Sequence, residues 1–299
     1  MGPMLSISDV EFYRENGYVV APNVLDGATL SKIRQTVAEI CDGARGRTTH
    51  DSVYDLEPSH RPDAPRVRRI KVPHANFPYF RELAEYGPMV EILRQLLGPD
   101  IRLHGSKINM KAPGYGSPVE WHQDWAFYPH TNDDVLAVGV LLDDADRDNG
   151  AMLVVPSSHR GPTWSHHDET GHFCGAMQPA ECPGLDLSTA VPLVGRAGSM
   201  TFHHVRAVHG SAQNFSDRPR TLLLYEFAAA DAYPLNGVGD FAEFQARMVA
   251  GTSPIEPRMV PAPVRMPLPP PRFKGSIYES QTATARRWFE MRQESAGAG

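Results

Sequence analysis

The sequence contains 299 residues, of which 41% are hydrophobic, and its formal net charge at pH 7 is −6. A chain of this size can bury one substantial core, and no run of lysine and arginine is long enough to follow a phosphate backbone, which argues against a nucleic-acid partner. No apolar stretch is long enough to span a bilayer and no charged leader precedes a hydrophobic stretch, which argues against a membrane partner.

Helical and extended signals alternate in the first hundred residues. Ser8 is placed to cap a short helix that Gly17 ends, and the apolar residues 18–20 then predict a strand. A second helix is expected at 28–41, where apolar residues recur at helical spacing. The polar stretch 42–65, with scattered glycine, proline and histidine, predicts a loop.

A third helix is expected at 88–97, because proline stands in its first turn and Gly98 follows its end. From about residue 101 the pattern changes to short strands separated by turn residues, which is typical of a sandwich or barrel of antiparallel sheets. The expected strands are 101–110, 119–125, 134–142, 151–155, 191–194, 199–203, 206–212 and 220–228.

The C-terminal part has a different composition. Many prolines at 253–272 predict an extended surface segment, and a final helix is expected at 282–293. We therefore expect one domain over residues 1–299, with a helical part to about residue 100, a β core at about 101–230 and an extended part from about 231.

The cysteines indicate the redox environment. Cys41, Cys174 and Cys182 are odd in number and irregularly spaced, which fits neither a disulfide framework nor a zinc ribbon. We expect reduced thiols and a cytoplasmic enzyme, present as a monomer or a homodimer.

A histidine and an aspartate two positions apart, His122 and Asp124, form the first candidate metal motif. On a strand, residues i and i+2 project from the same face, so both side chains reach one ion. Roughly one such pair is expected by chance in a chain with this many histidines, and His166 and Asp168 form a second. The spacing alone does not separate them. The loop that holds His166, His167 and Asp168 is expected to be solvated or to form a lid over the substrate pocket.

A downstream segment separates the two pairs. His209 lies about 85 residues after Asp124 on another expected strand, Ser211 shares its face, and Arg220 begins the next strand after a turn. Two histidines and one carboxylate leave metal positions open, the arrangement that suits Fe(II) and oxygen chemistry. The arginine is suited to hold a carboxylate through two parallel hydrogen bonds, as a dicarboxylate co-substrate requires.

Three segments carry a resemblance to a known family: WHQD at 121–124, the segment 149–159, and HGSAQN at 209–214 with RPR at 218–220. Their order and spacing resemble the phytanoyl-CoA dioxygenase family, which includes ectoine hydroxylases and natural-product hydroxylases. The resemblance covers roughly residues 8–230. It implies a mainly β fold with flanking helices and a double-stranded β-helix (jelly-roll) core. It also implies Fe(II) as the metal cofactor, with 2-oxoglutarate and O2 as co-substrates.

The resemblance also implies residue roles. His122, Asp124 and His209 match the iron ligands, and Arg220 matches the arginine that holds the distal carboxylate of 2-oxoglutarate. Further positions match co-substrate contacts, with the two lysines by looser similarity: Ser211, Asn109, Lys107 and Lys71. Aromatic residues near the ligands are candidates for the substrate pocket: Trp125, Phe127, Tyr128, Trp164 and Phe173. Of His203 and His204, one must point inward, in a role other than ligation.

The expected reaction is hydroxylation of an unactivated C–H bond of a small molecule, such as a natural-product intermediate, with release of succinate and CO2. The intact Asp124 argues against halogenation and for hydroxylation, with desaturation, epoxidation and ring formation left open. Residues 126–130 depart from the ectoine hydroxylase pattern. Two alternatives remain open. A cupin-type metal enzyme that does not use 2-oxoglutarate needs the same ligands but gives no reason for Arg220, and a non-catalytic binding protein on the same fold is expected to have lost a ligand.

Overall fold

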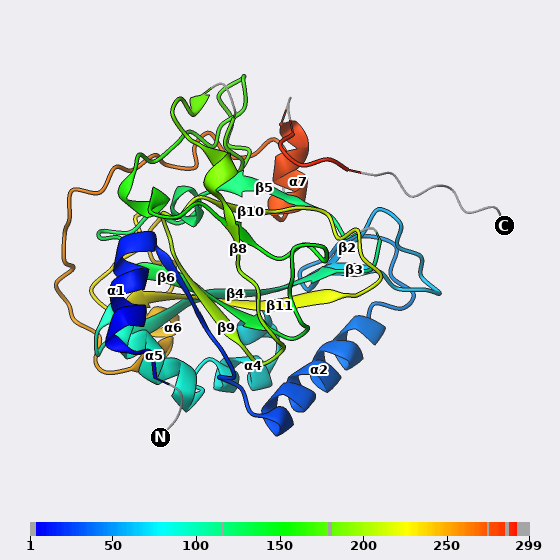
Figure 1. Ribbon diagram of the computed structural model, residues 1–299, viewed down its shortest axis with the longest axis horizontal. Coiled ribbons are helices and arrows are strands. Elements are labelled where there is room, and N and C mark those ends of the chain that lie inside the picture. The colour runs from blue at the N-terminus through cyan, green and yellow to red at the C-terminus, as the bar shows by residue number, and fades with distance from the viewer. Residues whose placement is uncertain (1–3, 115, 179–180, 274, 285–286, 292–299) are drawn as a thin grey trace.

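A computed structural model describes residues 4–114, 116–178, 181–273, 275–284 and 287–291. It contains two antiparallel sheets (Figure 1). The large sheet has the order β1-β9-β6-β11-β4-β3-β2, with β12 paired to β4, and the small sheet has the order β5-β10-β7-β8. The strands are β1 Tyr18–Ala21, β2 Tyr54–Leu56, β3 Val67–Lys71, β4 Ile101–Lys111, β5 Val119–His122, β6 Val135–Leu141, β7 Leu153–Val154, β8 Val191–Pro192, β9 Met200–His204, β10 His209–Ser211, β11 Arg220–Ala229 and β12 Met248–Ala250.

From β4 to β11 the chain passes back and forth between the two sheets. Strands β4, β6, β9 and β11 belong to the large sheet, and β5, β7, β8 and β10 belong to the small one. This winding is the jelly roll that the resemblance implied. The expected fold class is confirmed.

The long pair β4 and β11 shows how alternation divides the large sheet into two faces. Ile108 pairs with Leu223, and both belong to the core on the outer face. Their neighbours Lys107 and Leu224 pair with each other and face the space between the sheets, because successive residues of a strand point to opposite sides. Polar residues on one side of an otherwise apolar strand thus mark the functional face.

Helices cover the outer face of the large sheet, and Figure 1 shows α4 and α5 beneath it. Apolar residues of α2, α4 and α5 pack in one core with the sheet, among them Ile33, Phe80 and Ile92. Burial of this apolar stripe stabilises the helices more than their own propensity does. The helices are α1 Ile7–Asn16, α2 Gly27–Asp42, α3 Pro73–Asn76, α4 Pro78–Leu83, α5 Gly87–Leu97, α6 Phe241–Ala246 and α7 Ile277–Ser280. None of the helices in the described part of the chain has the length and apolar character needed to cross a membrane.

Several local expectations were wrong. The cap of the first helix is Ser6, whose side chain accepts a hydrogen bond from the Asp9 amide while the Asp9 carboxylate accepts one from the Ser6 amide, so the reciprocal capping box starts two residues before Ser8. The stretch 42–65 contains strand β2, which is stabilised by pairing with β3 rather than by its own sequence pattern. Strand β2 is only three residues long and polar residues dominate β3, so neither strand shows a clear strand pattern in the sequence.

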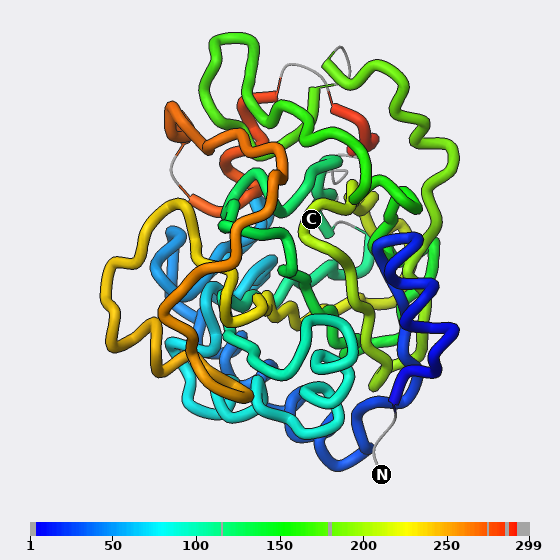
Figure 2. The backbone as a smooth tube through the Cα atoms, turned by 90° about the vertical axis from the view of Figure 1, so that its left-hand side faces the viewer, coloured from blue at the N-terminus to red at the C-terminus, as the bar shows by residue number. Residues whose placement is uncertain are grey.

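The C-terminal part follows the surface before it reaches the opening between the sheets. Residues 253–272 contain no helix or strand and run along one side of the molecule (Figures 1 and 2). Carbonyls of this segment hold the core: Pro263 accepts a hydrogen bond from the Trp125 indole, and Pro269 from the Phe173 amide. The final helix is not at 282–293. Helix α7 comes earlier, capped by Ser276, and residues 285–286 and 292–293 of the expected helix lie outside the described residues.

Candidate metal centre and co-substrate pocket

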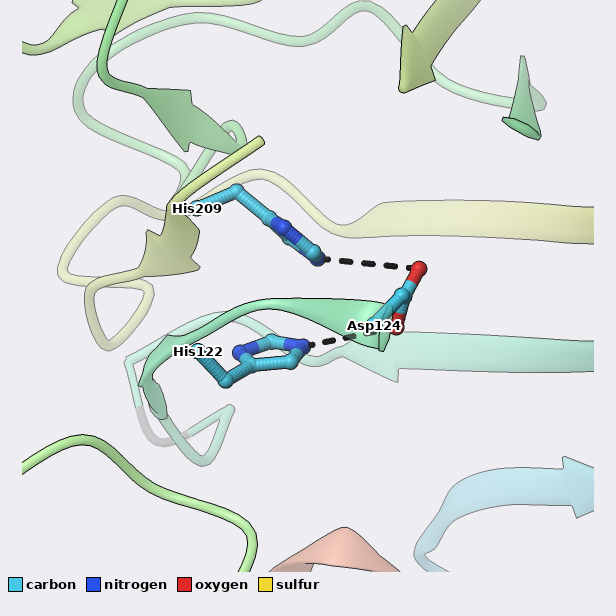
Figure 3. Close-up of side chains that lie close together, drawn as sticks. All are labelled: His122, Asp124 and His209. Carbon is cyan, nitrogen blue, oxygen red and sulfur yellow. Dashed lines mark ion pairs between the residues drawn. The ribbon is translucent and has the colours of Figure 1, made fainter. Parts of the chain in front are cut away.

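His122, Asp124 and His209 converge between the two sheets (Figure 3). His122 ends β5 and is the register partner of His209, which begins β10, so sheet pairing brings the two imidazoles together. The Nε2 atom of His122 lies 3.8 Å from Oδ1 of Asp124, and Nε2 of His209 lies 4.0 Å from Oδ2. All three side chains are buried. The nitrogen and oxygen atoms point at one small volume, as ligands of one ion do.

The backbone fixes the tautomer of both histidines. Nδ1 of His122 donates to the Glu120 carbonyl at 2.8 Å, and Nδ1 of His209 donates to the Ala207 carbonyl at 2.9 Å. A carbonyl only accepts, so the proton of each neutral ring is on Nδ1 and the lone pair of Nε2 faces Asp124. Metal-binding histidines in proteins are commonly oriented in this way.

The charge states also suit a divalent metal ion. Burial lowers the pKa of His122 well below its usual range and that of His209 to about 4, so both rings are neutral at pH 7. Burial alone would raise the pKa of Asp124. Lys107 and, after it, His203 outweigh burial, so this pKa lies well below its ordinary value and the carboxylate is charged. The donor set is therefore two neutral imidazoles and one carboxylate, which fits Fe(II).

Asp124 does not lie on the same strand as His122, as the spacing predicted. Strand β5 ends at His122, and Asp124 is the first residue of a 3-10 turn, η1 (Asp124–Ala126). Gln123 holds this bend: its buried amide donates to the carbonyls of Pro162 and Arg206. A strand end followed by a braced turn brings the two ligands together where a regular strand was expected.

The second His-x-Asp pair has a structural role. The Gln123 amide N–H donates to Nε2 of His166 at 2.8 Å, so this histidine braces the bend between the two ligands. Asp168 accepts hydrogen bonds from the amides of Thr170 and His172 and holds its own loop. Among the described residues this pair belongs to no group placed to hold a metal ion.

His203 is the inward-pointing member of the next histidine pair. It lies on β9 at 1% exposure, and its Nε2 is 3.6 Å from Oδ2 of Asp124. Neither ring nitrogen has a hydrogen-bond partner in the described chain. His204 points elsewhere, and its Nδ1 accepts from the Arg206 amide. His203 thus lies behind the carboxylate ligand, where the sequence alone did not assign a specific contact.

A cavity runs from the three ligands to Arg220, the first residue of β11. Its lining combines polar ends with apolar walls: Lys107, Asn109, Val119, His122, Asp124, Met152, His203, His209, Gly210, Ser211, Arg220, Leu222, Leu224, Ile277 and Tyr278. Arg220 is 3% exposed, and its Nε and Nη2 donate to the Gly150 carbonyl at 3.1 and 2.8 Å. Burial lowers its pKa only to about 10, so it remains charged at pH 7. A buried cation without a carboxylate in the described chain is costly unless an anion joins it.

Two further cavity residues have an unused polar atom. The hydroxyl of Tyr278 and Oδ1 of Asn109 are both buried without a hydrogen-bond partner in the described residues. Burial raises the pKa of Tyr278 to about 12, so its hydroxyl is protonated and can donate. Tyr278 lies on α7, far in sequence from every motif, which is why sequence reasoning missed it.

Three of the residues expected at the site lie elsewhere. Lys71 donates from Nζ to the Asp51 carbonyl at 2.9 Å and lines a surface hollow outside the cavity. Trp125 is fully buried in a cluster with Val135 and Val205, because the 3-10 turn aims it away from the opening. Trp164 packs against another cluster near Cys182. By contrast, Lys107, Asn109 and Ser211 do line the cavity.

An outer chamber of about 420 Å³ opens on the other side of Asp124. Phe127, Tyr128 and Phe173, three of the aromatic residues expected near the substrate, line it. Lys107 lies between the chamber and the cavity: its Nζ is 2.8 Å from Oε1 of Glu226 and 4.0 Å from Oδ1 of Asp124. The chamber gives a molecule access to the metal ligands without passing Arg220.

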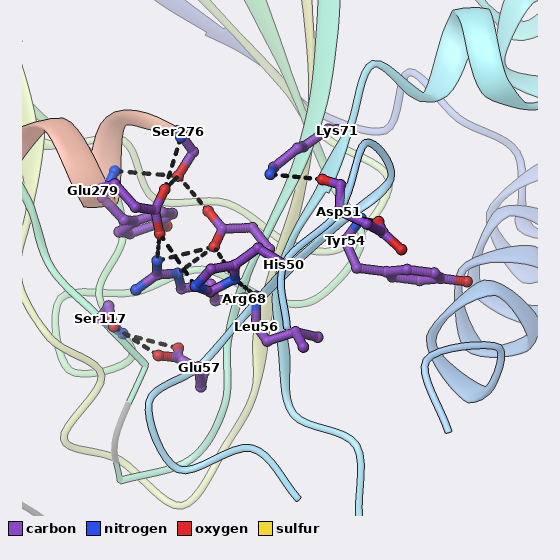
Figure 4. A network of polar contacts seen from close by, with 12 residues as sticks. His50, Asp51, Tyr54, Leu56, Glu57, Arg68, Lys71, Ser117, Ser276 and Glu279 are labelled. Carbon is purple, nitrogen blue, oxygen red and sulfur yellow. Dashed lines mark hydrogen bonds and ion pairs between the residues drawn. The ribbon is translucent and has the colours of Figure 1, made fainter. Parts of the chain in front are cut away.

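The C-terminal segment closes this region through a polar network (Figure 4). Arg68 on β3 donates to Asp55 at 2.9 Å and to Glu279 of α7, and Ser276 donates to Asp55. His50, Asp55 and Glu279 are close enough to hold a cation, but the Arg68 guanidinium already bonds both carboxylates. The network holds α7 so that Tyr278 lines the cavity.

Comparisons with known proteins cover the same region. A family model described as phytanoyl-CoA dioxygenase (PhyH) matches residues 13–222. The chain is 40% identical over 279 residues to a probable alpha-ketoglutarate-dependent hypophosphite dioxygenase of Stutzerimonas stutzeri, covering 93% of this chain and 97% of that protein. It is 29% identical over 234 residues to an ectoine dioxygenase of Bordetella bronchiseptica, covering 72% and 73%.

Among solved structures, the non-haem alpha ketoglutarate dependent carbocyclase SnoK from nogalamycin biosynthesis superposes with a TM-score of 0.62. The two chains are 25% identical, and the match covers 85% of this chain and 96% of that one. The family match at 13–222 includes all three converging ligands and Arg220.

Proposed function

Since this chain belongs to the phytanoyl-CoA dioxygenase family of non-haem iron, 2-oxoglutarate-dependent oxygenases, we propose that His122, Asp124 and His209 hold its Fe(II) and that Arg220 binds 2-oxoglutarate. The protein is a dioxygenase that depends on 2-oxoglutarate. The observation that carries the residue assignment is the single cavity with three converging ligands at one end and, at the other, a buried arginine that pairs with no carboxylate of the described residues.

The residues of the cavity have separate tasks in this proposal. Bound iron and 2-oxoglutarate together supply the oxygen-activating chemistry. Arg220, already fixed by the Gly150 carbonyl, pairs with the distal carboxylate of the co-substrate, and the hydroxyls of Ser211 and Tyr278 donate to it. Leu222 and Leu224 form an apolar wall that excludes water and strengthens these charged hydrogen bonds.

The outer chamber is the proposed substrate site. It adjoins Asp124, so a molecule there lies beside the metal without replacing a protein ligand. The relative from Stutzerimonas stutzeri acts by its name on hypophosphite. We therefore put hypophosphite first among the candidate substrates, ahead of C–H substrates such as natural-product intermediates. Its conversion to phosphite inserts one oxygen atom of O2 into a P–H bond, and the other oxygen atom enters succinate as CO2 leaves 2-oxoglutarate.

The reaction can be tested with purified protein, Fe(II), 2-oxoglutarate and O2. Phosphite formation followed by phosphorus NMR, in a one-to-one ratio with succinate, is the expected result. Succinate at the same low rate with and without hypophosphite would exclude this substrate while leaving the co-substrate assignment intact. The co-substrate assignment has its own readout, a weak visible band formed anaerobically when 2-oxoglutarate joins the Fe(II) protein. Absence of that band would contradict it.

A further inference from the structure

We propose that Arg69 is the anion-binding residue of the outer chamber and that the substrate therefore presents an oxyanion group, such as a phosphinate, phosphonate or carboxylate. This inference rests on the proposed function, because it places the substrate in the chamber beside the iron ligands. It assigns Arg69 a role distinct from that of Arg220, which serves the co-substrate.

Arg69 is an arginine to which the described residues offer no partner. It lies on β3 opposite Asn109 of β4 and lines the outer chamber. Its guanidinium makes no hydrogen bond or ion pair with the described residues, although its Nε is shielded from solvent. The adjacent Arg68 shows the usual alternative, since it is bonded to Asp55 and Glu279 and stacks over Tyr278. An arginine whose Nε is buried without a partner points to a ligand that completes it.

The charged residues that line the chamber leave the positive charge of Arg69 unbalanced. Two cations and two anions line it: Lys107, Arg69, Asp124 and Glu226. Glu226 is buried and lies 2.8 Å from Lys107, whose side chain is 16% exposed, so these two charges satisfy each other. Asp124 is committed to the metal. Among the described charged residues that line the chamber, the guanidinium of Arg69 alone has no counter-charge, so an anionic substrate fits the chamber better than a neutral one.

The position of Arg69 suits a substrate held for reaction. Arg69 is close enough to Lys107 for the two charges to interact. Lys107 in turn lies 4.0 Å from Asp124, so Arg69 is on the side of the chamber that faces the metal ligands. The neighbouring walls are apolar or aromatic: Phe127, Tyr128, Phe173 and Ile277. The planar guanidinium can bind two oxygens of an oxyanion in parallel, which leaves the remaining bonds of the ligand to face the metal side. An oxyanion thus gains both charge pairing and orientation.

A matched pair of small ligands tests the anion requirement. Propionate and propionamide have the same size but differ in charge, and hypophosphite adds a free phosphorus oxyanion. Each is titrated anaerobically into the protein loaded with Fe(II) and 2-oxoglutarate, with binding read by calorimetry and by the visible band. We expect wild-type protein to bind hypophosphite or propionate and to bind propionamide at least about 10-fold more weakly. Binding of hypophosphite alone indicates a free small oxyanion, and binding of propionate indicates a carboxylate group.

The variants are Arg69→Met and, as control, Arg61→Met, which removes an arginine whose side chain is 71% exposed. Arg69→Met should weaken anion binding about 10-fold or more and leave 2-oxoglutarate affinity within about two-fold, whereas Arg61→Met should change neither. Arg69 has no bond to the described chain to lose, so the melting temperature of this variant should stay that of the wild type.

Three outcomes would overturn the proposal: equal anion binding by Arg69→Met and wild type, equal binding of propionamide and propionate, or a parallel loss of 2-oxoglutarate binding in Arg69→Met. Failure of the proposed function looks different, because wild-type protein would then form no 2-oxoglutarate band. Calorimetry of the two variants with the anions would still decide the role of Arg69.

Discussion

Arg220 and Lys111 are direct partners across strands β11 and β4, so two buried basic residues lie side by side, of which Arg220 lines the cavity. Lys111 donates from Nζ to the carbonyls of Ser211 and Ala212, and burial lowers its pKa well below the usual range. Arg220 keeps its charge. Neither side chain pairs with a carboxylate of the described chain. This end of the cavity is therefore suited to an anion that the protein itself does not supply.

Replacing Arg220 by methionine should weaken 2-oxoglutarate binding. A charged hydrogen-bonded contact contributes about 1.5–3 kcal/mol, so the dissociation constant should rise about 10-fold to 100-fold. Titration of the visible band of the Fe(II) protein measures it. Arg218→Met is the matched control, since Arg218 lies two residues earlier, is half exposed and pairs with Asp146 on the surface. Equal effects of the two substitutions would contradict the role of Arg220.

Replacing Asp124 by alanine should abolish coupling of oxygen use to succinate formation. We expect a fall of roughly 100-fold or more, together with weaker iron binding, because a ligand and its charge are both lost. Asp168→Ala is the control, because Asp168 belongs to the second His-x-Asp pair and binds its own loop and Arg272 instead of the candidate metal centre. Iron content after anaerobic dialysis separates the two variants. Normal coupling in Asp124→Ala would remove it from the ligand set.

Tyr278→Phe removes one hydroxyl and keeps the ring that packs against Arg68. If this hydroxyl donates to the co-substrate, 2-oxoglutarate affinity should fall about 2-fold to 10-fold, the size of one neutral hydrogen bond. The melting temperature without 2-oxoglutarate should not fall, because the hydroxyl has no partner in the described residues. An unchanged affinity would show that the hydroxyl does not touch the co-substrate.

Arg68→Met should destabilise the protein by about 3 kcal/mol, because it leaves Asp55 as a buried carboxylate without its arginine. Urea unfolding measures this loss. The same variant should also bind 2-oxoglutarate more weakly, since Glu279 would no longer hold α7 against the cavity. Arg94→Met, which removes an exposed pair with Glu91, should cost less than about 1 kcal/mol. A cost as small as that of Arg94→Met would refute the bracing role of Arg68.

Stability should fall as the pH falls below about 6.5. Burial, with His104 nearby, lowers the pKa of His130 to about 3, whereas the ordinary value is 6.5. Between pH 6.5 and pH 3, His130 is protonated in the unfolded chain but neutral in the folded chain. Its contribution to stability therefore falls as the pH drops through 6.5. From pH 7 to pH 5 this one residue contributes a loss of about 2 kcal/mol. Urea unfolding of wild type and His130→Asn at both pH values should show a smaller difference for the variant. If wild type and His130→Asn lose the same stability between pH 7 and pH 5, the lowered pKa of His130 is contradicted.

The sequence predicted the jelly roll because its central strands carry their own signal. The run 135–142 is apolar on both faces, and β6 indeed lies buried in the large sheet. Strand β3 has no such signal, since Arg68, Arg69 and Lys71 dominate it and only pairing with β4 and β2 makes it a strand. Local pattern reveals strands that bury apolar side chains, and it misses strands that neighbours impose.

The residues of the candidate site also divide into those that a sequence motif reveals and those that only the folded chain brings into place. The triad and Arg220 could be named because short motifs carry them, and the structure brings all four to one cavity. Asp124 reaches its place through a bend braced by His166, which a strand pattern cannot predict. Tyr278 and Arg69 come from segments without a motif, and only the folded chain shows that they line the cavity and the chamber.

Helix α7 has a consequence for the order in which the protein can become active. Its Glu279 bonds Arg68, a residue 211 positions earlier in the chain. During synthesis both sheets leave the ribosome first, so the strands can pair while one wall of the cavity is still missing. A chain shortened to residue 272 should keep its strands but leave Arg220 open to water. Co-substrate binding therefore reports that the C-terminal segment has docked, which makes 2-oxoglutarate affinity a direct probe of late folding.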